Sequence, residues 1–182
     1  MHETEENSAI AVSPEDGSVV AKLDLPVDNV VAIGWWDGCL AVTQKTPKKL
    51  LKVDPTTGEI KQDITIDETD WAWVGCANAV NGKVWVADEF SPGIIVIDPD
   101  NPDERGFEIL AGPGPGCFTP TPDGVWHTDF WAKSMIETSY AGDLLDWGEI
   151  PFDVRGLAFD GEHLWALDAE THRLCVIEKA GE

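Results

Sequence analysis

The sequence contains few basic residues and no long apolar run. Its 182 residues include 12 Lys and Arg against 34 Asp and Glu, which gives a formal net charge of −22. Such a charge repels phosphate backbones and anionic membranes, and no 18 consecutive apolar residues are present to span a bilayer. We therefore predict a soluble protein that binds neither nucleic acid nor a membrane. Solubility and adaptation to a salty habitat are both open as reasons for the charge.

Signals for a compartment or for a structural metal are also missing. The N-terminus, MHETEENSAI, lacks the basic and apolar regions of an export signal. A signal removed earlier would leave the same sequence, so the compartment stays open. Residues 1–7 are acidic, and we expect them to form a disordered tail. The four cysteines form no CxxC pair, so we expect small buried hydrophobic side chains rather than a zinc site at Cys39, Cys76, Cys117 and Cys175.

Internal repetition is the strongest pattern in the sequence. Four units align on an Asp-Gly or Asn-Gly pair, with the glycines separated by 44, 42 and 37 residues, at Gly38, Gly82, Gly124 and Gly161. These dipeptides favour two-residue hairpin turns, so the strands on either side should pair antiparallel. The strand after the turn usually carries a tryptophan, at Trp85, Trp126 and Trp165. A third and a fourth strand follow, and no segment sustains a helical period.

A repeating four-stranded unit of about 40 residues is typical of a β-propeller blade. We predict an all-β, four-bladed propeller of antiparallel blades that forms a single domain over residues 1–182. The last unit supplies three strands, so residues 19–25 should complete it and close the ring through both termini. Residues 9–12 and 173–177 both look like a third strand, however, and one of them is surplus. The alternative is that two chains form one larger propeller, so monomer and homodimer are both open.

The repeats also resemble known families. The stretches GLAFDGEHLWALDAETHRLCVIE and LLKVDPTTGEI are similar to repeats of bacterial and plant-type glutaminyl cyclotransferases, streptogramin B lyase and quinoprotein-like propellers. This resemblance implies the fold. It implies no catalytic residue, because the cyclotransferases are expected to have five blades where four first strands are visible here. No histidine matches the context of the lyase's catalytic one, either.

The candidate site lies at the channel mouth, where loops that lead into first strands meet loops that join second to third strands. Its expected rim is aromatic and polar, which suits a sugar ring, a heterocycle or a peptide. The predicted ligand-binding residues are Trp71, Trp73, Glu89, Phe90, Asp129, Trp131, Arg155 and Glu170.

Three aspartates end second strands and are weak candidates for binding a hard cation, namely Asp88, Asp129 and Asp168. Each can instead accept hydrogen bonds from the following turn, so no metal is predicted. The sequence contains no GxSxG, HExxH or phosphate-loop motif, and no cofactor is expected. We therefore favour a non-catalytic module that binds a small molecule, glycan or peptide. The alternative is a lyase, cyclotransferase or lactonase that uses a rim carboxylate, and the sequence does not decide whether the chain is an enzyme.

Overall fold

The computed structural model describes residues 8–12, 19–25, 27–66, 74–88, 93–109, 115–129, 133–159, 161–171 and 173–177, and these form strands and turns. No helix that could cross a membrane is found among them.

The strands of the first two four-stranded sheets are β3 (Val30–Trp36), β4 (Cys39–Gln44), β5 (Lys49–Val53) and β6 (Ile60–Thr65), then β7 (Val74–Val80), β8 (Lys83–Asp88), β9 (Gly93–Asp98) and β10 (Asn101–Ile109). A third four-stranded sheet contains β11 (Pro115–Pro120), β12 (Gly124–Asp129), β13 (Ser134–Ser139) and β14 (Leu144–Glu149). The remaining strands form a three-stranded sheet, β15 (Val154–Phe159), β16 (Leu164–Asp168) and β17 (Leu174–Ile177), and a two-stranded hairpin, β1 (Ser8–Val12) and β2 (Val19–Asp24).

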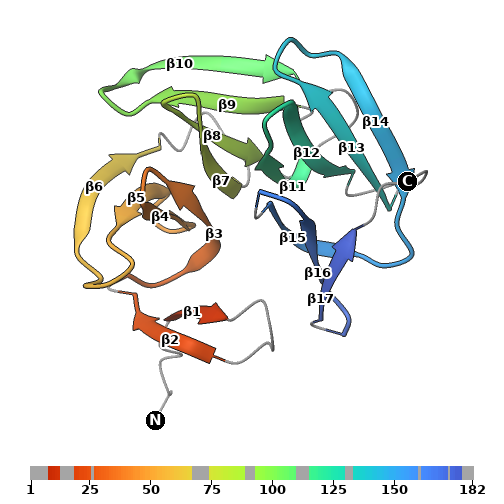
Figure 1. The fold of residues 1–182 in the computed structure, drawn as a ribbon. Coiled ribbons are helices and arrows are strands. Elements are labelled where there is room, and N and C mark those ends of the chain that lie inside the picture. The colour runs from red at the N-terminus through yellow and green to blue at the C-terminus, as the bar shows by residue number, and fades with distance from the viewer. Residues whose placement is uncertain are drawn as a thin grey trace.

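The sheets are arranged around a common centre as the blades of a β-propeller (Figure 1). Blades one to three are the four-stranded sheets and blade four is β15–β17. Every neighbouring pair of strands within a sheet is antiparallel, and the first strand of each blade is innermost. We call β3, β7, β11 and β15 the inner strands. The predicted all-β, four-bladed propeller is thus confirmed.

The predicted hairpin turns form as expected in blades one and two. Asp37 and Gly38 have φ angles of 44° and 76°, and Asn81 and Gly82 have φ angles of 51° and 76°. Both central residues therefore adopt the positive angles that this turn requires. Gly124 has a different role, because it begins β12 and a Cβ there would lie 2.2 Å from the carbonyl oxygen of Thr138.

Apolar side chains fill the spaces between neighbouring blades. One cluster joins blades one and two around Trp36, and a second joins blades two and three around Trp85 and Phe118. A third joins blades three and four around Trp126. Two of the tryptophans that recur after the hairpin turns, Trp85 and Trp126, are buried in these clusters, whereas Trp165 is only partly buried.

The ends of the chain pair differently from the prediction. Residues 19–25 were expected to add a fourth strand to blade four, but β2 pairs with β1, with Ala9 opposite Leu23. The hairpin also packs on blade one, where Leu23 and Ala9 contact the cluster of Leu25, Val42 and Leu51. Burial of Leu23 against blade one explains this choice, because pairing with β17 would take β2 away from that apolar surface. Among the described residues, no strand pairs with the outer edge of β17.

Candidate functional site

A cavity of about 610 Å³ lies between the inner strands. All four of them contribute to its wall, together with the connection from β12 to β13 and the loop that leads into β15. This volume falls in the usual range for small-molecule sites. The lining residues are Val31, Ala32, Cys76, Gly116, Cys117, Thr128, Asp129, Lys133, Ser134, Ile150, Phe152, Asp153, Val154, Arg155 and Ala169.

Two of the residues predicted to bind ligand line this cavity. Asp129 ends β12 and is 7% exposed, whereas Arg155 on β15 is exposed. Nearby, Lys133 Nζ lies 3.1 Å from Asp153 Oδ1 and forms an ion pair with it. No carboxylate among the described residues pairs with Arg155. Its guanidinium can therefore bind an anionic or strongly polar ligand group through several N–H donors.

The lining differs from one part of the cavity to another. The lining residues of β3 are Val31 and Ala32, and Phe152 adds an aromatic ring from the loop before β15. The charged side chains come from the ends of β12 and β15 and from the adjoining loops. This distribution suits a ligand with an apolar body and at least one polar group.

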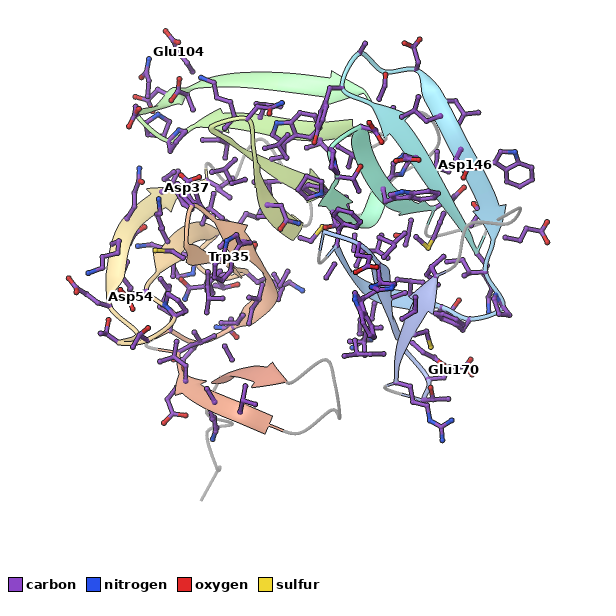
Figure 2. The ribbon with its side chains drawn as sticks, viewed as in Figure 1. Trp35, Asp37, Asp54, Glu104, Asp146 and Glu170 are labelled. Atoms are coloured by element: carbon purple, nitrogen blue, oxygen red, sulfur yellow. The ribbon has the colours of Figure 1, made fainter. Side chains whose placement is uncertain are left out.

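The other predicted site residues do not reach this cavity or cannot be placed. Glu170 is exposed in the turn after β16, next to the lining residue Ala169, and Figure 2 shows it beside β17 at the periphery. Five residues lie outside the described part of the chain, and their ligand-binding role stays a prediction, namely Trp71, Trp73, Glu89, Phe90 and Trp131.

Of the three aspartates considered as cation ligands, Asp168 caps the turn that follows its own strand. Asp168 Oδ1 accepts hydrogen bonds from the backbone N–H groups of Glu170 at 2.8 Å and Thr171 at 3.3 Å, and its Oδ2 accepts one from the Thr171 hydroxyl at 2.6 Å. Asp168 therefore caps its turn. The side chain of Asp88 is outside the described residues. Within the described ranges, no three His, Cys, Asp or Glu side chains are arranged to hold a metal ion.

Side chains of β7 bridge the inner strands, which sequence reasoning did not foresee. Asn78 Oδ1 accepts a hydrogen bond from the backbone N–H of Trp35 on β3 at 3.0 Å, and Asn78 Nδ2 donates one to the carbonyl oxygen of Phe118 on β11 at 2.9 Å. The backbone N–H of Phe118 in turn donates to Cys76 Sγ at 3.1 Å. Buried backbone groups need such partners, because leaving them unpaired is costly. A polar Asn inside the apolar run of GCANAV was the available signal.

Two buried titratable side chains lie on strands of blade three, Cys117 on β11 and His127 on β12. Burial raises the pKa of the Cys117 thiol to about 12, so this cavity-lining sulfur stays protonated at neutral pH. Burial also lowers the pKa of His127 to about 4. His127 Nε2 lies 3.2 Å from the Thr138 hydroxyl. Both groups are therefore electrically neutral at pH 7.

Comparisons with known proteins support the fold and nothing finer. Neither a protein-family model nor a curated protein matches the sequence. Similar solved structures include a glutaminyl cyclase from Myxococcus xanthus, with 9% identity and a TM-score of 0.63 over 82% of this chain and 65% of that one. A nidogen/laminin complex gives 16% identity and a TM-score of 0.67 over 96% of this chain and 71% of the other.

Streptogramin B lyase is also similar, with 19% identity and a TM-score of 0.60 over 88% of this chain. The match covers 55% of the lyase chain, so the protein spans little more than half of that structure. The neighbours thus include enzymes as well as a protein of a binding complex. At these identities the likeness shows a shared β-propeller fold alone.

Proposed function

We propose that the chain is a binding module that holds a small molecule, glycan or peptide in the cavity between its inner strands. The observation that carries this proposal is the cavity of about 610 Å³, which combines an apolar wall with a buried carboxylate and an exposed guanidinium. Pockets of this size with a few convergent polar groups are where proteins usually hold small ligands. Arg155 anchors a polar group of the ligand, and Val31 and Phe152 contact its apolar part.

A screen of thermal shifts tests this proposal. The library contains monosaccharides and oligosaccharides, aromatic heterocycles and short peptides, and hits are titrated by calorimetry. Arg155→Gln should weaken binding of a hit by about tenfold or more, because a charge-assisted hydrogen bond contributes about 1.5–3 kcal/mol. Glu170→Gln is the matched control, since Glu170 is exposed and outside the cavity lining, and it should bind as the parent does. Equal affinities in both variants would refute the assignment of this cavity.

A second candidate function is catalysis at the same cavity, and the position of Asp129 favours it. A carboxylate that is 7% exposed in a cavity with an arginine can act as a general base in a lyase, cyclotransferase or lactonase reaction. Product analysis after prolonged incubation of each hit with the protein separates the two functions. An enzyme would convert a hit, and Asp129→Asn would abolish conversion while binding persists. A binding module returns every hit unchanged.

A further inference from the structure

Four charged side chains line the cavity between the inner strands, and two of them neutralise each other. The four are Asp129, Lys133, Asp153 and Arg155. Lys133 Nζ lies 3.1 Å from Asp153 Oδ1, so these two form an ion pair within the protein. Arg155 and Asp129 are the remaining charges of the lining, one of each sign. The formal charge of the lining is thus zero, although the chain carries a net charge of −22.

Arg155 differs from the lysines of this chain in its contacts. The ion pairs between described residues all use lysines, as in Lys49 with Asp63 and Lys61 with Glu59 at 2.6 Å each. Within the described ranges no carboxylate pairs with Arg155, although acidic residues outnumber basic ones by 34 to 12. A guanidinium keeps its charge and has five N–H donors in a fixed fork. A carboxylate that matches this fork can therefore come from a ligand.

Asp129 presents the opposite charge from another blade. It ends β12 in blade three, whereas Arg155 lies on β15 in blade four. Asp129 is buried, so little water reaches its carboxylate. A ligand that fills the cavity removes that water, and burial of a charge is costly unless hydrogen-bond donors replace the water. An ammonium group supplies three such donors together with the opposite charge.

The rest of the wall is largely apolar. The side chains that make it so are Val31 and Ala32 on β3, and Ile150, Phe152 and Val154 around the start of β15. Such a surface favours contact with the aliphatic or aromatic side chains of a ligand, because both sides then lose contact with water. It offers no hydrogen-bond partner to the hydroxyl groups of a sugar, which makes their burial there unfavourable.

We propose that the ligand of this cavity is a zwitterion, an assignment that rests on the binding function proposed above. The ligand is an amino acid or a short peptide with apolar side chains and two unblocked termini. Its carboxylate pairs with the guanidinium of Arg155, and its ammonium group donates hydrogen bonds to the carboxylate of Asp129. Its side chains lie against Val31 and Phe152. Because a zwitterion has no net charge, the acidic surface does not repel it as it repels an anion.

Blocked and unblocked ligands test both charges on the parent chain. The probes are phenylalanine, leucyl-phenylalanine and leucyl-leucyl-phenylalanine, each also in an N-acetylated and a C-amidated form, and binding is measured by isothermal titration calorimetry. Acetylation removes the positive charge of a ligand and amidation removes the negative one. The tightest unblocked ligand should bind at least tenfold more strongly than either of its blocked forms, because each blocked form loses a charge-assisted hydrogen bond.

Two variants assign each terminus of the ligand to its residue. Arg155→Gln should weaken binding of the unblocked ligand at least tenfold and leave the affinity for the amide unchanged, because the amide has no carboxylate. Asp129→Asn should weaken binding of the unblocked ligand at least tenfold and leave the affinity for the acetylated form unchanged. This crossed pattern is a double-mutant cycle between protein and ligand. Partial unfolding of a variant would instead weaken all three forms alike.

The chain offers a matched control for each variant. Arg173→Gln changes an exposed arginine that directly precedes β17, and Asp123→Asn changes an exposed aspartate in the turn before β12. Asp123 and Asp129 lie at opposite ends of that strand, and neither Asp123 nor Arg173 lines the cavity. Both control variants should bind the unblocked ligand as the parent does.

Equal affinity of the parent for the unblocked ligand and for either blocked form would overturn the zwitterion assignment, as would failure of all three unblocked ligands to bind. The binding function would survive that result if a sugar or a heterocycle from the screen binds and its affinity depends on Arg155. If no compound of any class binds, the binding function and the zwitterion assignment fail together.

Discussion

Asn78 Nδ2 donates a hydrogen bond to the carbonyl oxygen of Phe118 across 2.9 Å, so a side chain of blade two holds the inner strand of blade three. The same carboxamide accepts a hydrogen bond from the backbone N–H of Trp35 in blade one. Among the described residues, each inner strand pairs with another strand on one side only, and exposed strand edges are a liability in β-proteins. A single asparagine therefore fixes the relative position of three blades around the cavity.

Replacement of Asn78 should destabilise the fold. Asn78→Ala removes both hydrogen bonds and leaves the N–H of Trp35 and the carbonyl of Phe118 without this partner. We expect the free energy of unfolding to fall by about 2–4 kcal/mol, since each buried group left unpaired costs about 1–3 kcal/mol. Urea denaturation measures the change. Asn101→Ala is the control, because Asn101 is exposed on β10, and it should change stability by less than about 0.5 kcal/mol. Similar losses in both variants would contradict the bridging role.

His127 should make stability depend on pH in the acid range. Its folded-state pKa is about 4 because of burial, below the ordinary value of 6.5. The unfolded chain therefore binds a proton more readily between these values, and stability is lost as pH falls from about 6.5 to about 4. The loss attributable to this residue is roughly 3 kcal/mol. His127→Leu should show a correspondingly flatter profile when urea melts at pH 7 and pH 4 are compared. Parallel profiles for parent and variant would show that His127 does not titrate in this way.

A buried and an exposed tryptophan should respond differently to replacement by alanine. Trp126 is buried between blades three and four, so Trp126→Ala should cost about 3–5 kcal/mol through the cavity it leaves. Trp147 on β14 is 61% exposed, and Trp147→Ala should cost less than about 1 kcal/mol. Paired denaturant melts give the comparison. A large loss on truncation of Trp147 would mean that β14 packs more tightly than its exposure indicates.

The net charge of −22 should make the protein more stable at high salt if its surface is adapted to a salty habitat. Repulsion among carboxylates weakens as the Debye length falls from about 10 Å at 0.1 M to about 3 Å at 1 M salt. The described residues offer only a few exposed ion pairs, such as Lys49 with Asp63, that screening would weaken in return. The melting temperature should therefore rise clearly between these sodium chloride concentrations. A constant melting temperature would reduce the charge to a solubility feature.

The blades could be predicted because their signals are local. Asp37-Gly38 and Asn81-Gly82 specify turns through their own backbone angles, and the tryptophan repeated after the turn marks an inter-blade position. Gly124 shows the limit of this reasoning. Glycine is needed there because its backbone lies close to Thr138, and not because its φ angle is positive. The strand pairing of the chain ends could not be predicted in this way, because it depends on packing between residues far apart in the sequence. Residues 9–12 and 173–177 have equivalent patterns, and only the contacts of Leu23 with blade one decide where β2 lies.

The candidate site was partly predictable, because the place of a residue in the repeat indicates which part of a blade it lies in. Asp129 and Arg155 could be placed at the channel mouth because each follows from its position in the repeat, at the end of a second strand and the start of a first strand. Asn78 and Cys76 were missed because their partners lie in other blades. Their hydrogen bonds depend on the offset between inner strands, which no pattern within one unit specifies.

The most direct test of the central claim, that the cavity between the inner strands holds a ligand, is the alkylation rate of Cys76. This thiol lines the cavity, whereas Cys39 and Cys175 are partly buried and lie outside the lining. Cys117 also lines it but stays protonated, because its pKa is about 12. Iodoacetamide labelling read by peptide mass spectrometry is compared with and without a saturating hit from the screen. The account predicts at least tenfold slower labelling of Cys76 and unchanged rates at Cys39 and Cys175. An unchanged rate at Cys76 while the ligand is bound would contradict it.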